Sequence, residues 1–312
     1  MRYAGKKLIS VLATLLIVSF LVFLAFAVIP GDAAVAKLGT QATPERIAAL
    51  RAEMGLDRPF FVRYGNWLLS ALKGDFGKSY SYGESVSALI GQKLPITLAL
   101  SILSFLIMIV CAIPLGIYTA KHEGGALDRI IMVVNQVVMA VPPFFSGIMI
   151  TYVFGLLLKW FQPGSFVSYT VNLGRFLHYL LFPAVAIALP KIAMTVKLLR
   201  SSLIQEAKKD YVRTAYSKGN RTNGVLYRHV LKNAMIPVIT FLAMTFTDMI
   251  AGSVIMEQVF SVAGIGRLLI SSISSRDYPV VEAVIVLLAL IVVLVNLAAD
   301  VLCRALDPRI RR

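Results

Sequence analysis

The 312-residue sequence predicts an all-α integral membrane protein with six transmembrane helices and both termini in the cytoplasm. Hydrophobic residues make up 58% of the chain and charged residues only 15%, well below the roughly 25% that soluble domains carry. The charged residues lie between long apolar runs, so the net charge of +15 favours a membrane protein over a nucleic-acid-binding protein.

Each predicted span is an apolar run close to the roughly 20 residues that cross a bilayer core. The six runs are 8–29, 95–120, 130–158, 176–199, 235–259 and 280–302. The fourth run is the weakest, because Lys191 interrupts it. Ala25-Phe26-Ala27 in the first run resembles a signal-peptidase site, but the run is longer than the usual signal-peptide core, which favours an uncut span.

Basic residues in the loops predict the orientation. The segments 1–7, 121–129, 200–234 and 303–312 hold 17 Lys and Arg, whereas the short loops 159–175 and 260–279 hold four. By the positive-inside rule, the first set is cytoplasmic. The predicted parts are the cytoplasmic N-terminus with the first helix (1–30), an extracytoplasmic segment (31–94), a five-helix core (95–302) and a cytoplasmic tail (303–312).

The extracytoplasmic segment is predicted to contain local helices. Thr43 is a favourable N-cap with Pro44 at the first helical position, which predicts a helix through Met54 that stops at Gly55. Trp67 and the two leucines after it are expected at the membrane interface. Two interpretations stay open: a small lid-like subdomain, or a docking surface for an external partner.

The sequence shows no arrangement typical of an enzyme. Gly77-Lys78-Ser79 resembles the end of a phosphate-binding loop, but Leu72 stands where that motif needs glycine. The three histidines and two cysteines have no metal-type spacing. We therefore expect no catalytic residues, no metal site and no cofactor bound by this chain.

Charges and prolines inside the spans are the candidate pathway residues. Asp248 lies in the middle of the fifth run and either lines a hydrated pathway or pairs with a neighbouring helix. Lys191 is expected to extend toward the interface, and Glu282 to lie at the interface. Pro142 and Pro143 predict a kink, which suits a pathway that changes shape but also occurs in plain packing.

The cytoplasmic loop 200–234 carries eight of the basic residues and is predicted to form a helical hairpin. A first helix is expected over 203–218, with Leu203, Ala207, Tyr211 and Ala215 on one face. Gly219 would end it, and Thr222 would cap a second helix to about Asn233, before Pro237. The hairpin either lies on anionic lipid or grips a cytoplasmic protein and transmits its movement to the spans.

These residues resemble a known family. Glu206-Ala207, Asp210 to Ala215 and Lys218-Gly219 are similar to the EAA loop of ABC importer permeases. Matches along the chain resemble the oligopeptide, dipeptide and nickel branch; they include Pro30-Gly31-Asp32, Gly74-Asp75-Phe76-Gly77 with Ser79, Arg276-Asp277-Tyr278-Pro279 and Asp307-Pro308-Arg309. The sequence departs from the pattern at Lys208, where a second alanine is usual, and at Ala33 and Ala263, where prolines are usual.

The resemblance implies a type I importer permease, multi-pass in a bacterial inner (plasma) membrane. It implies an ATPase-coupling loop made of Glu206, Ala207, Asp210, Tyr211, Arg213, Ala215 and Gly219. Implied partners are two cytoplasmic ATPases that carry ATP and magnesium, a second homologous permease, an external solute-binding protein and the lipid bilayer, without nucleic acid. The cargo would be peptides, nickel or metal chelates, or glutathione-like solutes. The alternative is a stand-alone channel or secondary carrier whose basic loop faces lipid.

Overall fold

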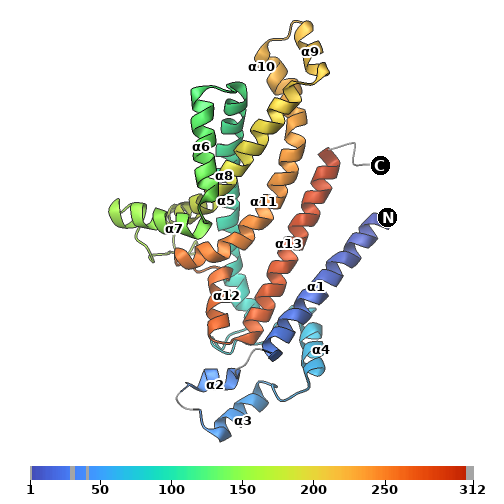
Figure 1. Cartoon of the computed structure of the whole chain (residues 1–312). Helices are drawn as coiled ribbons and strands as arrows, with labels where there is room; N and C mark the ends of the chain where they lie inside the picture. The colour runs from blue at the N-terminus through green and yellow to red at the C-terminus, as the bar shows by residue number, and fades with distance from the viewer. Residues whose placement is uncertain (1, 29–31, 40–41, 307–312) are drawn as a thin grey trace. The chain divides into compact units, whose positions relative to one another are not determined.

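The computed structural model describes residues 2–28, 32–39 and 42–306, and helices make up most of the described chain (Figure 1). The chain divides into two compact units, Met1–Thr97 with Ala263–Val293 and Leu98–Val262 with Leu294–Arg312. Two of the motifs that resemble the importer permeases, Pro30-Gly31 and Asp307-Pro308-Arg309, lie outside the described residues.

The first unit is built from short helices and the ends of longer ones. Its elements are α1 (Arg2–Val28), α2 (Ala33–Leu38), α3 (Pro44–Glu53), α4 (Phe60–Ala71), the start of α5 (Val86–Lys121), α12 (Ile265–Ser274) and the start of α13 (Tyr278–Leu306). Phe20 and Phe23 of α1 pack edge-on against Phe60 and Tyr64 of α4, with ring centroids 5.5–5.8 Å apart. This aromatic contact fixes α4 on α1.

The core of the first unit joins α5, α12 and α13. Its buried side chains are Val86, Leu89 and Ile90 from α5, Ile265 and Leu268 from α12, and Val280, Ala283 and Val284 from α13. The segment 260–279 was expected to be a loop, but it contains α12, which is too short to span a bilayer and buries one apolar face instead.

The predicted helix in the extracytoplasmic segment is confirmed. The hydroxyl of Thr43 accepts a hydrogen bond from the Arg46 amide, Pro44 occupies the first helical position, and α3 ends at Glu53. Gly55 follows with φ of +66°, a conformation that glycine adopts without a steric penalty.

The second unit contains the remaining helices, both long and short. They are α6 (Ala126–Ala140), α7 (Pro143–Ile150) with its π-helical continuation η2 (Thr151–Leu157), α8 (Leu173–Ala207), α9 (Asp210–Ser217), α10 (Thr222–Val225), the π-helical η3 (Leu226–Val230) and α11 (Leu231–Val259). In this unit α8 packs against α6, α7 and α11, and α7 also contacts α11. The parts of α5 and α13 that follow Thr97 and Val293 belong to it as well.

Within the described part of the chain, five helices are long and apolar enough to span a membrane, and a bent pair makes a sixth candidate. The predicted kink at Pro142 and Pro143 is confirmed: the chain turns by 102° between α6 and α7, so the run 130–158 is not one straight helix. The helix ends before Pro142, since proline lacks an amide hydrogen and restricts the residue that precedes it.

Candidate functional site

The loop after α8 differs from the single helix predicted over 203–218. The helix ends at Ala207, Lys209 has an extended backbone with φ of −73° and ψ of 151°, and α9 starts at Asp210. This break changes which residues face inward: Glu206 and Val212 are buried, whereas Ala207 and Tyr211 are exposed. The predicted face is therefore wrong at its two central positions and right at its ends, Leu203 and Ala215.

Glu206 is the centre of a hydrogen-bonded cluster that holds the break. Its carboxylate accepts a hydrogen bond of 2.8 Å from the Tyr211 hydroxyl and pairs with Lys209 Nζ at 2.5 Å. The same hydroxyl accepts a hydrogen bond of 3.0 Å from Nδ2 of Asn233 on α11. Glu206 thereby connects the end of α8 to α9 and to the start of α11.

Tyr211 links the three helices as a neutral phenol. Burial raises its pKa above the usual value, and the adjacent Glu206 carboxylate raises it further, while the Asn233 hydrogen bond lowers it. The phenol therefore keeps its proton at neutral pH and can donate to the carboxylate. This arrangement assigns Tyr211 to bracing the loop.

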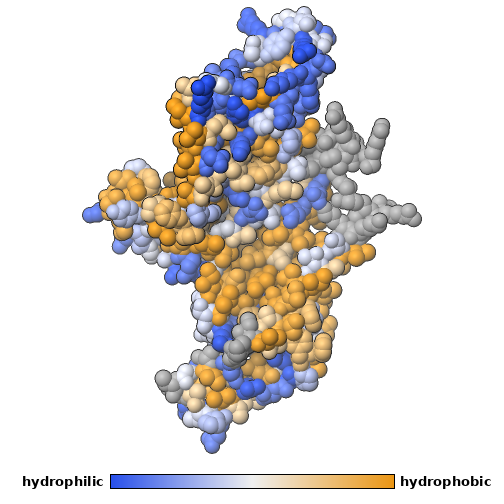
Figure 2. Space-filling view, in the orientation of Figure 1, coloured by the Kyte–Doolittle hydropathy of each residue, from blue (hydrophilic) through white to orange (hydrophobic). Residues whose placement is uncertain are grey.

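Other residues of the loop point to solvent. The side chains of Asp210 and Arg213 are 96% and 80% exposed, and the closest approach of their charged atoms is 3.7 Å. Such an exposed pair stabilises a helix little, so these charges are free to contact another protein. The surface over α9 and α10 is largely hydrophilic (Figure 2).

Gly219 forms the turn that follows α9, as predicted. Its φ is +78°, and an added Cβ would meet no heavy atom within 4 Å. Asn220 closes the turn by donating from Nδ2 to the Ala215 carbonyl at 2.9 Å. The requirement for glycine therefore comes from the backbone conformation and not from a lack of space.

The second helix of the hairpin is longer than predicted. Arg221 and not Thr222 is the N-cap, without a side-chain hydrogen bond. The chain then continues through η3 into α11 and does not stop near Asn233. Pro237 lies inside α11, since neighbouring groups in a membrane bundle can satisfy the backbone carbonyl that proline leaves unpaired.

Removal of the Tyr211 hydroxyl tests the bracing role. We expect Tyr211→Phe to lower stability by about 1 kcal/mol, because both Glu206 and Asn233 lose a hydrogen-bond partner. Thermal unfolding in detergent, together with limited proteolysis of the loop, would measure it. Tyr216→Phe is the matched control, since Tyr216 is 46% exposed and its hydroxyl has no partner among the described residues. Equal losses in both variants would contradict the bracing role.

An ion pair between Arg200 of α8 and the buried Asp128 of α6 lies close to this cluster, because Arg200 precedes Glu206 by six residues on α8. The sequence pattern did not indicate this pair. Asp128 of α6 is buried and accepts two hydrogen bonds from Arg200 of α8, Nε to Oδ1 at 2.7 Å and Nη2 to Oδ2 at 2.8 Å. The Gly124 amide donates to the same carboxylate at 2.9 Å. This bidentate pair attaches the start of α6 to the last part of α8.

The candidate pathway residues occupy two places in the second unit. Asp248 of α11 pairs with Lys191 of α8, with Nζ and Oδ2 2.9 Å apart. Asp248 therefore pairs with a neighbouring helix, one of its two expected roles, and Lys191 does not extend toward the interface as predicted. Pro142 and Pro143 form the bend between α6 and α7. After the bend, α7 packs closely against α11. A Cβ atom added to Gly147 of α7 would lie 3.0 Å from Sδ of Met256 on α11. A pathway role for these residues stays a prediction.

Two of the motifs that resemble the importer permeases contact each other in the first unit, one through Ser79 and the other through Asp277. The fully buried Asp277 accepts hydrogen bonds from the Ser79 hydroxyl, the Tyr80 amide at 2.9 Å and the Ser81 amide at 3.1 Å. Ser79, the last residue of the Gly77-Lys78-Ser79 sequence that resembles the end of a phosphate-binding loop, therefore anchors the loop before α5 onto the start of α13.

Comparisons with known sequences match almost the whole chain. A family model described as binding-protein-dependent transport system inner membrane component matches residues 112–312, and its N-terminal counterpart matches residues 1–101. A probable peptide ABC transporter permease protein of Sinorhizobium fredii is 34% identical over 309 residues, with 99% of each chain covered. A glutathione transport system permease protein of Salmonella choleraesuis is 35% identical over 311 residues, with 100% of this chain and 99% of the relative covered.

A solved structure shares the fold. A chain of the MetNI methionine ABC transporter, in an inward-facing conformation, matches with a TM-score of 0.57 at 18% identity. The match covers 70% of this chain and 96% of that chain. The predicted all-α membrane fold is confirmed by this likeness and by the apolar helices of the structure.

Proposed function

The chain belongs to the binding-protein-dependent transport system inner membrane component family, and from this premise we propose that it is the peptide-translocating permease of an ATP-driven importer. It is an inner-membrane protein that crosses the bilayer several times. The proposed complex contains a second homologous permease, two cytoplasmic ATPases that bind ATP and magnesium, and an external solute-binding protein. Both termini lie in the cytoplasm, and ATP hydrolysis takes place on the separate ATPase subunits.

The geometry of the 206–219 loop is the observation that carries this proposal. The buried Glu206 cluster makes a rigid base between α8 and α11, while Asp210 and Arg213 project into solvent. A loop that only lay on lipid would not need a buried, fully partnered carboxylate at its root, because an exposed basic helix binds headgroups without one. A rigid base can instead transmit the movement of a bound ATPase to α8 and α11, which opens the pathway alternately to each side.

Peptides are the proposed cargo. Full-length relatives at 34–35% identity are named as peptide and glutathione permeases, and glutathione is itself a small peptide-like solute. Nickel or metal chelates stay a less supported cargo, since no group of three or more metal-ligating side chains occurs in the described parts of the chain. The external binding protein would select among peptides before the permease meets them.

Purification of the tagged chain with its native neighbours tests the assembly. A mild-detergent pull-down is expected to recover an ATPase and a second permease with the unmodified chain. Glu206→Ala should recover much less ATPase, because the loop loses the carboxylate that joins Tyr211 and Lys209. Recovery of the second permease should not change in this variant. A chain that purifies alone would overturn the proposal and favour a stand-alone channel or carrier.

A further inference from the structure

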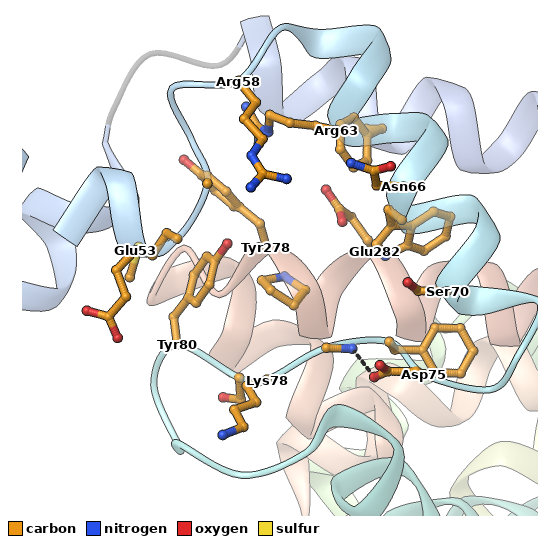
Figure 3. Close-up of a pocket in the computed structure, with 18 of the residues that line it drawn as sticks. Glu53, Arg58, Arg63, Asn66, Ser70, Asp75, Lys78, Tyr80, Tyr278 and Glu282 are labelled. Carbon is orange, nitrogen blue, oxygen red and sulfur yellow. Dashed lines mark hydrogen bonds between the residues drawn. The ribbon is translucent and has the colours of Figure 1, made fainter. Parts of the chain in front are cut away.

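A cavity of about 600 Å³ lies inside the first unit, outside the coupling loop (Figure 3). Its walls come from α3, α4, the 75–83 loop and the start of α13. Figure 3 shows Arg58, Arg63 and Asn66 on one side, Lys78 and Tyr80 on the opposite side, and Glu282 between them. The volume lies within the range of pockets that hold small molecules.

Glu282 is the unusual residue of this cavity. It was expected at the membrane interface, but it is only 5% exposed and its side chain faces the cavity. Its carboxylate makes no hydrogen bond or ion pair with any residue that the structure describes. The nearby Arg63 guanidinium instead lies over the Phe23 ring, 5.5 Å from the centroid. A buried carboxylate without a direct partner is unfavourable in the empty protein, so a cationic ligand would relieve it.

A second polar group in the wall is also unpartnered. The indole Nε1 of Trp67 on α4 is buried and has no hydrogen-bond partner in the described structure. Burial raises the pKa of Tyr80 to about 12, with Glu282 adding to the effect, so its hydroxyl stays protonated and can donate. The wall therefore combines the buried carboxyl group of Glu282 with two neutral donors, Trp67 and Tyr80. The other two acidic residues of the wall, Glu53 and Asp75, are exposed.

We propose that this cavity binds the amino-terminal end of a peptide, with Glu282 accepting from the ammonium group and Trp67 donating to a neighbouring carbonyl oxygen. The choice of a peptide rests on the proposed function, whereas the ammonium group follows from the unpaired carboxylate. The site would make the first unit a receptor for cargo on the permease itself, separate from the pathway in the second unit. A divalent metal fits less well, because Glu282 has no cluster of further ligands around it.

The two tryptophans of the chain allow a direct test. Trp160 is 59% exposed, so Trp160→Phe leaves Trp67 as the sole fluorescent indole in an otherwise intact chain. We would titrate this full-length variant in lipid nanodiscs with the peptide Ala-Ala-Ala and follow the emission of Trp67. A saturable change is expected, and N-acetyl-Ala-Ala-Ala should bind roughly tenfold more weakly or worse, since it lacks the ammonium group. No saturable change with Ala-Ala-Ala would overturn the proposal.

Variants separate a ligand site from a structural role. Glu282→Gln should weaken Ala-Ala-Ala binding roughly tenfold or more, because the amide cannot carry the negative charge that pairs with an ammonium group. It should not lower the temperature of thermal unfolding, since it keeps the size of a buried side chain that has no direct partner. Glu45→Gln is the matched control, since Glu45 is an exposed glutamate of α3 that does not line the cavity, and the affinity of this variant for Ala-Ala-Ala should not change. Unchanged affinity in Glu282→Gln would refute the assigned role.

A further titration tests whether the ammonium group that binds belongs to a peptide or to a lysine side chain. The lysine analogue n-butylamine carries an ammonium group but no neighbouring carbonyl, so it should bind more weakly than Ala-Ala-Ala. Equal affinity for the two would overturn the peptide assignment and favour a lysine of a docked protein. Peptide transport by the assembled complex is measured separately. If the complex transports peptides while the cavity binds none, the inference fails and the proposed function stands.

Discussion

Replacement of Gly219 by valine is expected to reduce transport strongly while the chain still reaches the membrane in normal amount. Gly219 has φ of +78°, where a β-branched residue is disfavoured by about 1–2 kcal/mol or more. A Cβ atom at this position would meet no heavy atom within 4 Å, so the strain comes from the backbone conformation of the turn. The turn is expected to open, and Asp210 and Arg213 would then no longer be presented as one surface.

Transport of labelled peptide into membrane vesicles that hold the complete importer would measure the effect. We expect a loss of roughly tenfold or more, since each 1.4 kcal/mol is a factor of ten in the population of the competent turn. Gly219→Asn should retain much of the activity, because asparagine tolerates this backbone conformation. Gly224→Val is the matched control: Gly224 lies in the same exposed loop, has ample space and has an ordinary φ. Normal transport by Gly219→Val would contradict the coupling role.

The sequence predicted the elements whose cause is local. Apolar runs of about 20 residues predict spanning helices whatever their neighbours are, and five of the six became single long helices. The N-cap at Thr43 and the glycine turn at Gly219 depend only on backbone conformation and adjacent residues, and both are present.

Features that depend on contacts between distant residues were missed. Helical spacing alone favoured one helix over 203–218, because the break at Lys209 is held by Asn233, 22 positions beyond Tyr211 on another helix. Arg200 was counted only as a basic loop residue and Asp128 was not singled out, since their pairing joins residues 72 positions apart. Hydropathy placed Glu282 at the interface because it cannot show that α4 and the 75–83 loop cover this residue.

The pair formed by Asp128 and Arg200 leads to the second large expected effect. Asp128→Asn should destabilise the protein by about 3 kcal/mol, because Arg200 loses its anionic partner in a place where Asp128 is only 3% exposed. Unfolding of the purified chain by denaturant in detergent would measure the loss. Asp57→Asn is the control: Asp57 pairs with Arg51 where both side chains are about half exposed, so less than about 1 kcal/mol is expected.

A double-mutant cycle shows whether the two charges act as one unit. Asp128→Asn combined with Arg200→Gln should cost less than the sum of the single variants, because neither buried charge is then left alone. Additive losses would mean that the contact in the structure contributes little. Arg200 precedes Glu206 by six positions on α8, so the pair holds α6 against the helix that carries the proposed coupling loop. Loss of the pair should therefore loosen the loop at its root even when every loop residue is intact.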